Sequence, residues 1–441
     1  MHATEVLARY SSEFLQQPLP REVIHHAKRA VIDWYASLFP GLASAPVRLL
    51  EETLAENLDR GKARLAQGRA ATARAAALLN GTAAHAAEVD DSFRDAMYHP
   101  GAATIAAALA AAHVRRATGL EFLRGVVLGY EVSTRIGVVM GRPHYRFWHS
   151  TGTIGTFGAA AAVGGILGLD ERAFAHGLAT AATFAAGLQQ AFRMDSMSKP
   201  LHAGRAAEAG LLAAQLAGRG LTGSLDVLDG EAGMGQAMST GPDWNEIGNT
   251  LGKDFNITRL TFKNHIGCGH TFAAIDGVLE LKRLHGLQPD DIMRVHVATY
   301  QPALDIACYL QPITSNEARF SLTYVVASAL VHGSVRLAAY EPARLDDPVT
   351  RALMERVDVA VDPEIDAAFP GKRAARIRIE TRDGRLLTHM QPNRKGDPEQ
   401  PLSDAELEGK LMELASPVIG SEAARELIAR IWALDVGKEL P

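Results

Sequence analysis

Residues 85–100 read HAAEVDDSFRDAMYHP and separate two alanine-rich apolar stretches, 70–84 and 101–113, both of which are typical of helices. The sixteen positions hold four carboxylates, two imidazoles and a tyrosine. A surface loop with two helix caps would also be polar, since Asp and Ser often cap helices. So dense a polar segment between apolar helices is better explained as an exposed turn at the mouth of a cavity that a rigid scaffold holds in place.

The whole chain has 441 residues, of which 47% are hydrophobic and 22% charged, and its net charge is −5. These values predict a globular protein with more than one domain. No basic patch with interleaved aromatic residues is present, so we expect no nucleic-acid partner. The only cysteines are Cys268 and Cys308. They exclude a disulfide scaffold and favour a cytoplasmic location.

The amino-terminal segment has no basic stretch followed by an apolar core, so we do not expect a signal peptide. The most apolar stretch, 157–169, is shorter than the roughly 20 residues that a membrane span needs. We therefore expect a buried helix there and no membrane partner.

Periodicity predicts helices through most of the chain up to about residue 220, and it leaves 220–265 unassigned. The predicted helices cover 1–15, 21–39, 49–58, 70–87, 101–118, 120–140, 152–169, 171–190 and 200–218. Two more helices are predicted near the carboxyl end, at 403–415 with a capping box of Ser403 and Glu406, and at 421–432.

The pattern changes after about residue 290, where short alternating runs predict strands. These runs lie at 292–300, 357–361, 376–381 and 386–390, and predicted helices at 273–285, 321–333 and 348–356 accompany them. Asp383-Gly384 predicts a hairpin turn between the last two strands. The sequence thus predicts a mainly α fold: a large, discontinuous, all-helical domain of residues 1–266 with 398–441, and a smaller α+β domain of residues 267–397.

Residues 144–153, HYRFWHSTGT, form a second candidate site segment. The Ser-Thr-Gly-Thr run precedes an apolar helix, so it can cap that helix and can bind an anion through unpaired N–H groups. His149 lies at this helix end, and Tyr145 is close by in sequence. The alternative to a binding site is that these residues only cap the helix, with the neighbouring aromatic side chains packed over its end.

Residues 193–205, RMDSMSKPLHAGR, form a third segment, which contains Arg193, Lys199 and His202. Lys199 precedes Pro200, which suits the first turn of a helix. The helix dipole and burial would both disfavour its charged form. A neutral lysine is a competent base, whereas a charged one holds a carboxylate. The alternative is an ordinary surface lysine.

Two further segments are weaker candidates. Residues 262–271 contain His270 and fall near the expected domain boundary, where a glycine-rich hinge is the alternative. Tyr324 lies in an apolar helical segment, where a core tyrosine is the usual interpretation. The residues His85, Glu88, Asp91, Asp95 and His99 could supply metal ligands, but their spacing fits no standard zinc or EF-hand pattern, so we expect no metal. No dinucleotide or P-loop motif supports nucleotide binding.

Taken together, these segments resemble the MmgE/PrpD family, whose members include 2-methylcitrate dehydratase, cis-aconitate decarboxylase and iminodisuccinate epimerase. The resemblance extends over almost the whole chain, and the runs that begin at His149 and Lys199 are long and specific. The matching residues are Leu19-Pro20, Asp33, Asn80-Gly81, His85, Asp90-Asp91, His99-Pro100-Gly101, 149–160, 199–207, Cys268-Gly269-His270-Thr271, Phe320-Ser321 and Tyr324.

The resemblance implies a helical large domain, a smaller α+β lid domain, a homodimer, and no metal or organic cofactor. The family's shared chemistry removes a proton, or CO2, next to a carboxylate. We expect a dehydratase-like lyase that acts on a small di- or tricarboxylate. The alternatives are an epimerase of an iminodisuccinate-like dicarboxylate and a non-catalytic helical interaction protein.

The expected site combines these segments. The expected catalytic residues are His99, Lys199, Tyr145, Tyr324 and His149, with His99 or a neutral Lys199 as the base. We expect a carboxylate of the acidic turn, Glu88 or Asp91, to orient the His99 ring. The expected substrate-binding residues are Glu88, Asp91, Ser92, Thr151, Arg193, His202 and His270.

Several positions depart from the decarboxylase pattern of the family. Glu88 stands where the decarboxylase has Asp, Ser92 stands where it has Thr, one residue is added before His99, and a further His of the decarboxylase falls on Phe272. These differences argue against cis-aconitate decarboxylation. The segment 189–195, together with Tyr145, is most similar to the epimerase branch.

Overall fold

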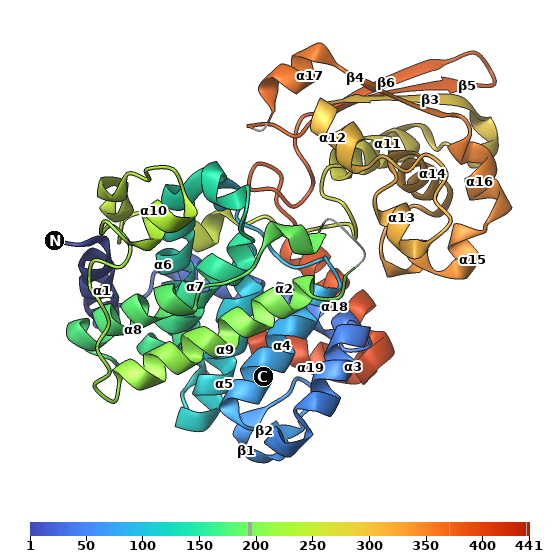
Figure 1. The fold of residues 1–441 in the computed structure, drawn as a ribbon. Coiled ribbons are helices and arrows are strands. Elements are labelled where there is room, and N and C mark those ends of the chain that lie inside the picture. Colours follow the sequence, from blue (N-terminus) through green and yellow to red (C-terminus); the bar gives the residue numbers. More distant parts are fainter. Residues whose placement is uncertain (193–195, 370, 438) are drawn as a thin grey trace. The chain divides into compact units, whose positions relative to one another are not determined.

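The computed structural model describes residues 1–192, 196–369, 371–437 and 439–441, and the chain forms two compact units (Figure 1). The first unit consists of Met1–Phe262 and Ser403–Pro441, and the second of Lys263–Leu402. The chain therefore leaves the first unit and returns to it. The boundaries lie a few residues from the positions at 266 and 397 that the sequence pattern indicates.

The first unit is a helical assembly with the apolar helix α7 (Ser150–Leu167) near its centre (Figure 1). The mainly α fold expected from the sequence is confirmed. The other helices of this unit are α1 (Ala3–Phe14), α2 (Arg21–Gly41), α3 (Ala45–Thr53), α4 (Ala73–Ala86), α5 (Pro100–Arg115), α6 (Gly119–Tyr145), α8 (Glu171–Phe184), α9 (Lys199–Ala217), α10 (Met234–Met238), α18 (Asp404–Ile419) and α19 (Ser421–Trp432).

Helix α7 is long and apolar enough, by length and composition alone, to cross a membrane. It begins at Ser150, seven residues before the apolar stretch 157–169. The additional first turns contain the polar residues Ser150, Thr151 and Thr153, which are also buried. Of its 18 residues, 89% are buried inside the first unit. This burial is typical of a core helix packed on all sides by other helices.

The expectation of an all-helical large domain is wrong in one place. The helix predicted at 49–58 ends at Thr53, and the chain then forms a hairpin of β1 (Leu58–Arg64) and β2 (Ala70–Ala71). The hairpin contains three residues with positive φ, Asp59, Gly61 and Gly68, at 58°, 84° and 87°. A helix cannot accommodate these left-handed conformations.

Helices α4 and α9 touch at their backbones, because each has a glycine at the crossing. A Cβ atom on Gly204 would lie 2.2 Å from both the Leu78 carbonyl oxygen and Thr82 Oγ1, and one on Gly81 would lie 2.9 Å from Gly204 Cα. The contact brings together side chains that lie near these glycines along each helix. They are His85, one turn after Gly81 on α4, and His202 and Lys199, which precede Gly204 on α9.

The second unit contains a four-stranded sheet in the order β4–β3–β5–β6 (Figure 1). Its strands are β3 (Ile292–Thr299), β4 (Val357–Val361), β5 (Ala375–Thr381) and β6 (Leu386–Gln391). Strands β3 and β4 are parallel, and the other two pairs are antiparallel. The helices are α11 (Phe272–His285), α12 (Gln301–Ile306), α13 (Ser315–Arg319), α14 (Leu322–His332), α15 (Pro342–Leu345), α16 (Pro348–Met354) and α17 (Pro363–Ala368).

The sequence locates this α+β unit well. All four predicted strands are confirmed, as are the hairpin at Asp383-Gly384, where Gly384 has a φ of 87°, and the helices corresponding to α11, α14 and α16. In β5 the side chains at 375, 377 and 379 are buried while those at 376 and 378 are exposed. The alternating pattern identified these strands because one face of the sheet packs on α11 and the other face is open to solvent.

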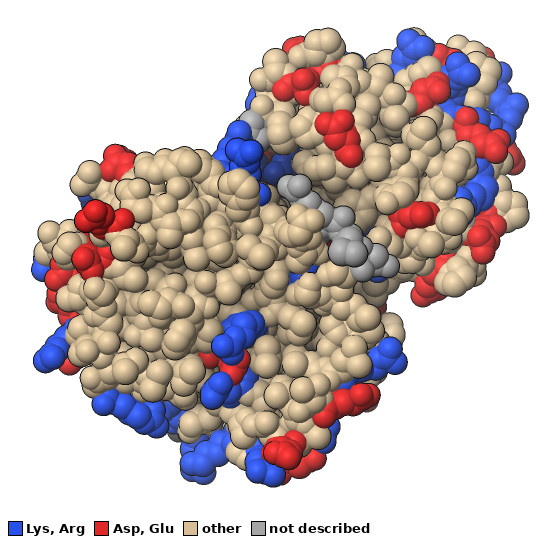
Figure 2. Space-filling view, in the orientation of Figure 1, with Lys and Arg blue, Asp and Glu red and all other residues tan. Residues whose placement is uncertain are grey.

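The face of the molecule drawn in Figure 2 carries acidic and basic side chains of both signs on each unit, without a broad field of one charge. The mixture agrees with the small net charge of the sequence. A surface of this kind offers no long positive stripe on the face shown.

The α4–α9 contact predicts that Gly204→Ala destabilises the protein. The added methyl group would meet backbone oxygen and the Thr82 hydroxyl, which cannot move without separating the helices. We expect a loss of roughly 1–3 kcal/mol, measured by urea denaturation. The matched control is Gly409→Ala in α18, where no atom lies within 4 Å of the added methyl group. It should be neutral or stabilising, by up to about 1 kcal/mol. An equal loss in both variants would contradict the close contact.

Candidate active site

Four helix ends of the first unit meet around the acidic turn. They are the carboxyl end of α4 and the amino ends of α5, α7 and α9, which carry His85, His99, His149 and Lys199 respectively. The rings of His99 and His149 lie 5.1 Å and 5.4 Å from the His85 ring, measured between centroids. The structure thus unites three of the segments that the sequence singled out.

His85, Asp90 and His99 form a chain of hydrogen-bonding groups. His85 Nδ1 lies 2.7 Å from Asp90 Oδ2, and His99 Nδ1 lies 3.4 Å from the same oxygen and 2.7 Å from the Asp91 carbonyl oxygen. His85 and Asp90 are buried, while the His99 side chain is 20% exposed. Because Nδ1 faces these acceptors, Nε2 is the His99 nitrogen that can accept a proton from another molecule.

Asp91, one of the two residues expected to orient His99, contacts the ring through its backbone carbonyl and not through its carboxyl group. The orienting groups are the Asp90 carboxylate and the Asp91 backbone carbonyl. The backbone also contributes, since His99 caps α5 in an extended conformation with a φ of −108°, as the following Pro100 requires. Its N–H donates to Thr151 Oγ1 over 3.4 Å, which connects this cap to the first turn of α7.

His149 and His202 form a second imidazole pair, with their Nδ1 atoms 3.0 Å apart. Burial lowers the pKa of His149 well below its usual value, and the charges of the neighbouring His85 and Lys199 lower it further. The pKa of His202 is lowered to about 4, again chiefly by burial. Both rings are therefore neutral near pH 7, and one must carry its hydrogen on Nδ1 and donate to the other.

Lys199 begins α9 as expected, but it is not a neutral lysine. Its ammonium group forms an ion pair with the Glu88 carboxylate, and the two side chains are 23% and 28% exposed. Burial on its own lowers the pKa of Lys199, but the Glu88 charge and hydrogen bond outweigh it, so that the pKa is raised above its usual value. Of the two states that the sequence left open for this lysine, the raised pKa favours the charged one, which holds a carboxylate.

Glu88 reaches Lys199 from a backbone with a φ of 59°, a left-handed conformation that is uncommon for residues other than glycine. Such conformations are held by the surrounding structure and concentrate at functional sites. Tyr145, at the end of α6 and partly buried, lies close enough for its hydroxyl to influence the charge of Lys199. The ion pair is therefore placed beside a tyrosine at the edge of the site.

Asp91 and Ser92 support the turn, although we expected them to bind substrate. The Asp91 carboxyl group is buried, accepts from Gly101 N–H over 3.0 Å and lies 2.7 Å from the Tyr130 hydroxyl. Burial, together with the charge of Asp33, raises the pKa of Asp91 to about 8. Ser92 is held through its backbone, which exchanges two 2.9 Å hydrogen bonds with Thr261. The Asp91 carboxyl group is thus occupied within the protein, whereas the Ser92 bonds involve only its backbone.

A lysine from the carboxyl-terminal segment also supports this turn. Lys410 in α18 is fully buried, pairs with Asp33 over 2.5 Å and donates to the Val89 carbonyl oxygen over 2.8 Å. Val89 lies between Glu88 and Asp90, so this bond fixes the backbone between two carboxylates that point to different partners. The returning segment is thus a structural support of the candidate site.

Three of the expected site residues are not part of this cluster in the first unit as described. Arg193 lies outside the described residues, and the other two belong to the second unit. Tyr324 lies in the core of the second unit, and its hydroxyl donates to the Ala339 carbonyl oxygen, so it presents no proton to a ligand. His270, also in the second unit, lies 2.9 Å from the Tyr300 hydroxyl, and burial together with the charges of Arg373 and Arg394 lowers its pKa to about 3.

His85, Asp90 and His99 are also a group of side chains that could hold a metal ion, since one ligand atom from each lies within 4.8 Å of the others. The sequence did not single out this set, because Asp90 was not among the ligands considered. In the structure His85 Nδ1 is hydrogen-bonded to Asp90 Oδ2, and His99 Nδ1 lies 3.4 Å from the same oxygen while it is hydrogen-bonded to the Asp91 carbonyl oxygen.

The arrangement is suited to binding and activating a small anion. The amino ends of α5, α7 and α9 each carry a partial positive charge, and the Lys199 ammonium group adds a full one. Nearby stand two neutral imidazoles and one imidazole backed by a carboxylate. A site of this kind can hold a carboxylate and stabilise negative charge that develops on an adjacent carbon atom.

Sequence reasoning missed His85, Asp90 and Lys410 as parts of this site. The first two lie within residues 85–100, five positions apart, and their hydrogen bond depends on how the chain turns after α4. Lys410 is the only lysine in an otherwise amphipathic helix far along the chain, and no local pattern connects it to the acidic turn.

Comparison with known proteins agrees with the segments described above. Family models described as the MmgE/PrpD N-terminal domain and the MmgE/PrpD C-terminal domain match residues 5–247 and 265–435. The cis-aconitate decarboxylase-like protein oryM of Aspergillus oryzae is 29% identical over alignments that cover the whole chain and 96% of that protein. The cis-aconitate decarboxylase of Homo sapiens is 28% identical over 82% of this chain and 76% of its own length.

The buried Asp91 predicts a pH-dependent stability. Its pKa is about 8 when folded, against a usual 3.8, so its contribution is fully present below about pH 4 and is lost as the pH rises towards 8. Asp91→Asn keeps the shape without the charge. Relative to this variant, the parent protein should lose stability with rising pH, by at most about 1.4 kcal/mol per pH unit. Urea denaturation across this range measures it.

The control for this prediction is Asp95→Asn, which alters a carboxylate of the same turn whose side chain is 42% exposed. It should leave the pH dependence of unfolding as it is in the parent. Parallel pH curves for the parent protein and Asp91→Asn would contradict a neutral Asp91 in the folded protein.

Proposed function

The chain belongs to the MmgE/PrpD family, and on this basis we propose that it is a cofactor-independent lyase that removes a proton next to a carboxylate of a small di- or tricarboxylate. A lyase-type role is supported by the relatives named cis-aconitate decarboxylase. The observation that carries the proposal is the convergence of Lys199, three helix amino ends and the His85–Asp90–His99 chain.

In this proposal Lys199 and the helix ends bind the substrate carboxylate. A lysine whose pKa is raised stays charged at neutral pH, so it holds an anion rather than accepting a proton. The substrate carboxylate would take the place of Glu88 beside the ammonium group, and Glu88 is sufficiently exposed to turn towards water. Thr151 and the first turn of α7 supply further donors.

His99 is the proposed base. Its Nδ1 faces the Asp91 carbonyl and the Asp90 carboxylate, which leaves Nε2 to take the proton. The imidazolium ion that forms is stabilised by Asp90, and His85 holds Asp90 in place from the other side. An imidazole supported by a buried carboxylate is an effective general base near neutral pH.

The second half of the reaction needs a proton donor. In a dehydratase-like elimination the departing hydroxide must be protonated, and Tyr145 and the neutral His149 are the proposed donors. His202 fixes the orientation of the His149 ring through their shared hydrogen bond. Loss of CO2 from a neighbouring position, the reaction named for the relatives, would pass through the same kind of carbanion.

An epimerase is the second candidate function. It needs two proton carriers on opposite faces of one carbon atom, and the site contains an imidazole chain on one helix end and a lysine–tyrosine pair on others. The exchange of substrate hydrogen without elimination would distinguish it. A non-catalytic interaction protein would show neither exchange nor turnover.

We also propose that the protein is a cytoplasmic homodimer. The two cysteines are free in the structure, which suits a reducing compartment. A dimer is supported by the family membership and by exposed apolar side chains beside the site, including Phe147, Leu188 and Met197, which are 60%, 55% and 56% exposed. Light scattering after size-exclusion chromatography measures the oligomeric state.

The function is tested by incubating the protein in D2O with a panel of di- and tricarboxylates and following the mixture by NMR. Elimination should give an alkene, and decarboxylation should give CO2 and a shorter acid. Deuterium incorporation without either product would establish the epimerase instead. Activity should survive EDTA. If EDTA abolished it and a divalent ion restored it, the cofactor-independent mechanism would be wrong.

Lys199→Met should fold and lose turnover. The ion pair with Glu88 is partly exposed, so its removal should cost roughly 1 kcal/mol or less in unfolding free energy. Loss of the charge that holds the carboxylate should reduce kcat/KM on the order of 10²–10³-fold. Lys199→Arg, which keeps the charge, is the control and should retain more activity. Parent-like kcat/KM in the methionine variant would show that Lys199 does not contact substrate.

His99→Asn should reduce kcat by on the order of 10²–10⁴-fold, the range expected for loss of a general base. Asp90→Asn should shift the acidic limb of the pH–rate profile, because Asp90 stabilises the charged His99 ring. The control is His26→Asn in α2, a histidine remote from this cluster in the same unit. An unchanged kcat for His99→Asn, in a protein that still melts cooperatively, would eliminate His99 as the base.

A further inference from the structure

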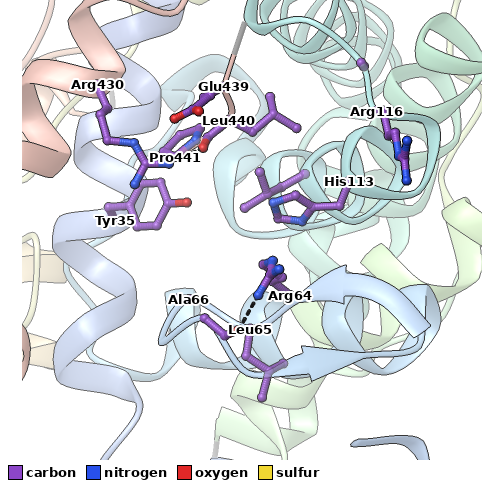
Figure 3. A pocket seen from close by; sticks show the side chains of 13 residues that line it. Tyr35, Arg64, Leu65, Ala66, His113, Arg116, Arg430, Glu439, Leu440 and Pro441 are labelled. Atoms are coloured by element: carbon purple, nitrogen blue, oxygen red, sulfur yellow. Dashed lines mark hydrogen bonds between the residues drawn. The ribbon is translucent and has the colours of Figure 1, made fainter. Parts of the chain in front are cut away.

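A cavity lies in the first unit at the opposite end of α5 from His99. Its volume is about 570 Å³, and Figure 3 shows the side chains that surround it. Helix α5 has 16 residues, so at about 1.5 Å per residue the two ends are roughly 24 Å apart. The cavity is lined by parts of α2, the β1–β2 hairpin, α5, α19 and residues 439–441.

Three arginines from three different elements face this cavity. They are Arg64 at the end of β1, Arg116 after α5 and Arg430 in α19 (Figure 3). Among the described residues that line it, Glu439 has the only acidic side chain, and Pro441 adds the terminal carboxyl group, so three guanidinium groups face two carboxyl groups. The cavity therefore holds an excess of positive charge, although the protein as a whole is slightly acidic.

The guanidinium groups have no carboxylate partner within the part of the chain that the structure describes. Arg64 donates to the Gly68 carbonyl oxygen over 2.9 Å, and Arg430 donates to the Leu440 carbonyl oxygen. Each guanidinium group has five N–H donors, so most of these donors remain for a ligand. By contrast, two other arginines of this unit, Arg74 and Arg205, are both paired with Glu208.

His113 adds a polar group to the wall of the cavity. Its Nδ1 atom is buried and has no hydrogen-bond partner among the described residues. Burial, reinforced by the Arg64 charge, lowers the pKa of His113 to about 4, so the ring is neutral when the cavity is empty. A buried polar atom without a partner is costly, and a ligand that reached it would remove that cost.

The dipole of α5 explains only part of this cluster. Cations near the carboxyl end of a helix are favourable, which accounts for Arg116. It does not account for Arg64 on the hairpin or Arg430 on α19, which approach from other sides (Figure 3). Like charges held around one hollow repel each other unless an anion lies between them.

We propose that this cavity is a binding site for a small polyvalent anion, carrying two or more phosphate or carboxylate charges, and that it is separate from the candidate active site. Arginine forks bind such groups through paired hydrogen bonds. The volume lies within the range of small-molecule sites, and Tyr35, Leu65 and Leu109 supply an apolar wall. An adjoining cavity of about 370 Å³ shares Arg64, His113 and Arg116 and adds Lys62.

The test uses the whole protein with two probes at constant ionic strength, inorganic pyrophosphate and citrate. Each should be titrated by isothermal calorimetry and should raise the melting temperature. Arg64→Gln and Arg116→Gln should each weaken binding at least tenfold, and because both side chains are exposed the variants should fold. Arg172→Gln, which removes an exposed arginine from α8, is the matched control and should bind like the parent.

Because citrate can also occupy the candidate active site, both titrations are repeated with Lys199→Met. Binding that persists in this variant and is lost in the Arg64 and Arg116 variants supports the proposal. The stronger of the two probes identifies the anion as a phosphate or a carboxylate. The proposal is overturned if neither probe binds, if binding survives both arginine substitutions, or if it is lost only with Lys199→Met. None of these results depends on the proposed catalytic function.

Discussion

The contact between α4 and α9 at Gly81 and Gly204 is the constraint on which the candidate site depends. Because neither glycine has a side chain, the two helices approach until backbone atoms touch. This contact brings the carboxyl end of one helix to the amino end of the other, and so places His85 beside His149, and Lys199 beside Glu88. A larger residue at either glycine would push the two helices apart. It would thereby separate the histidines from the lysine without changing any of these residues itself.

Three carboxyl groups of the acidic turn each have different partners and a different environment. Glu88 is paired with Lys199, Asp90 lies between His85 and His99, and Asp91 is buried beside Tyr130 with its pKa raised to about 8. Adjacent carboxylates would repel each other if all were charged and unpaired. The turn avoids this by directing successive side chains in different directions, with the backbone at Val89 held by Lys410.

Helix α5 connects two places of very different character. Its amino end, capped by His99, belongs to the candidate active site, and its carboxyl end lies at the cavity of Arg64, Arg116 and Arg430. Between them the helix is buried and consists largely of alanine. Such a helix is stiff and closely packed, so a ligand that tightened one end would act on a rigid element shared with the other.

The sequence by itself determined the mainly α fold, the α+β unit with its strands and hairpin, and the segments that carry His99, His149 and Lys199. These features depend on local periodicity, capping and turn chemistry, which are properties of neighbouring residues. It did not determine the hairpin at 58–71, the partner of His99, or the charge of Lys199. Those depended on residues that meet only after folding. The hairpin needs Leu58–Arg64 to pair with Ala70–Ala71, the His99 partner depends on the turn that brings Asp90 between two histidines, and the charge of Lys199 depends on Glu88 opposite it. Whether a side chain is charged depends on its burial and on the charged groups within a few ångströms of it. The number of residues that separate two groups along the chain does not determine the distance between them in space.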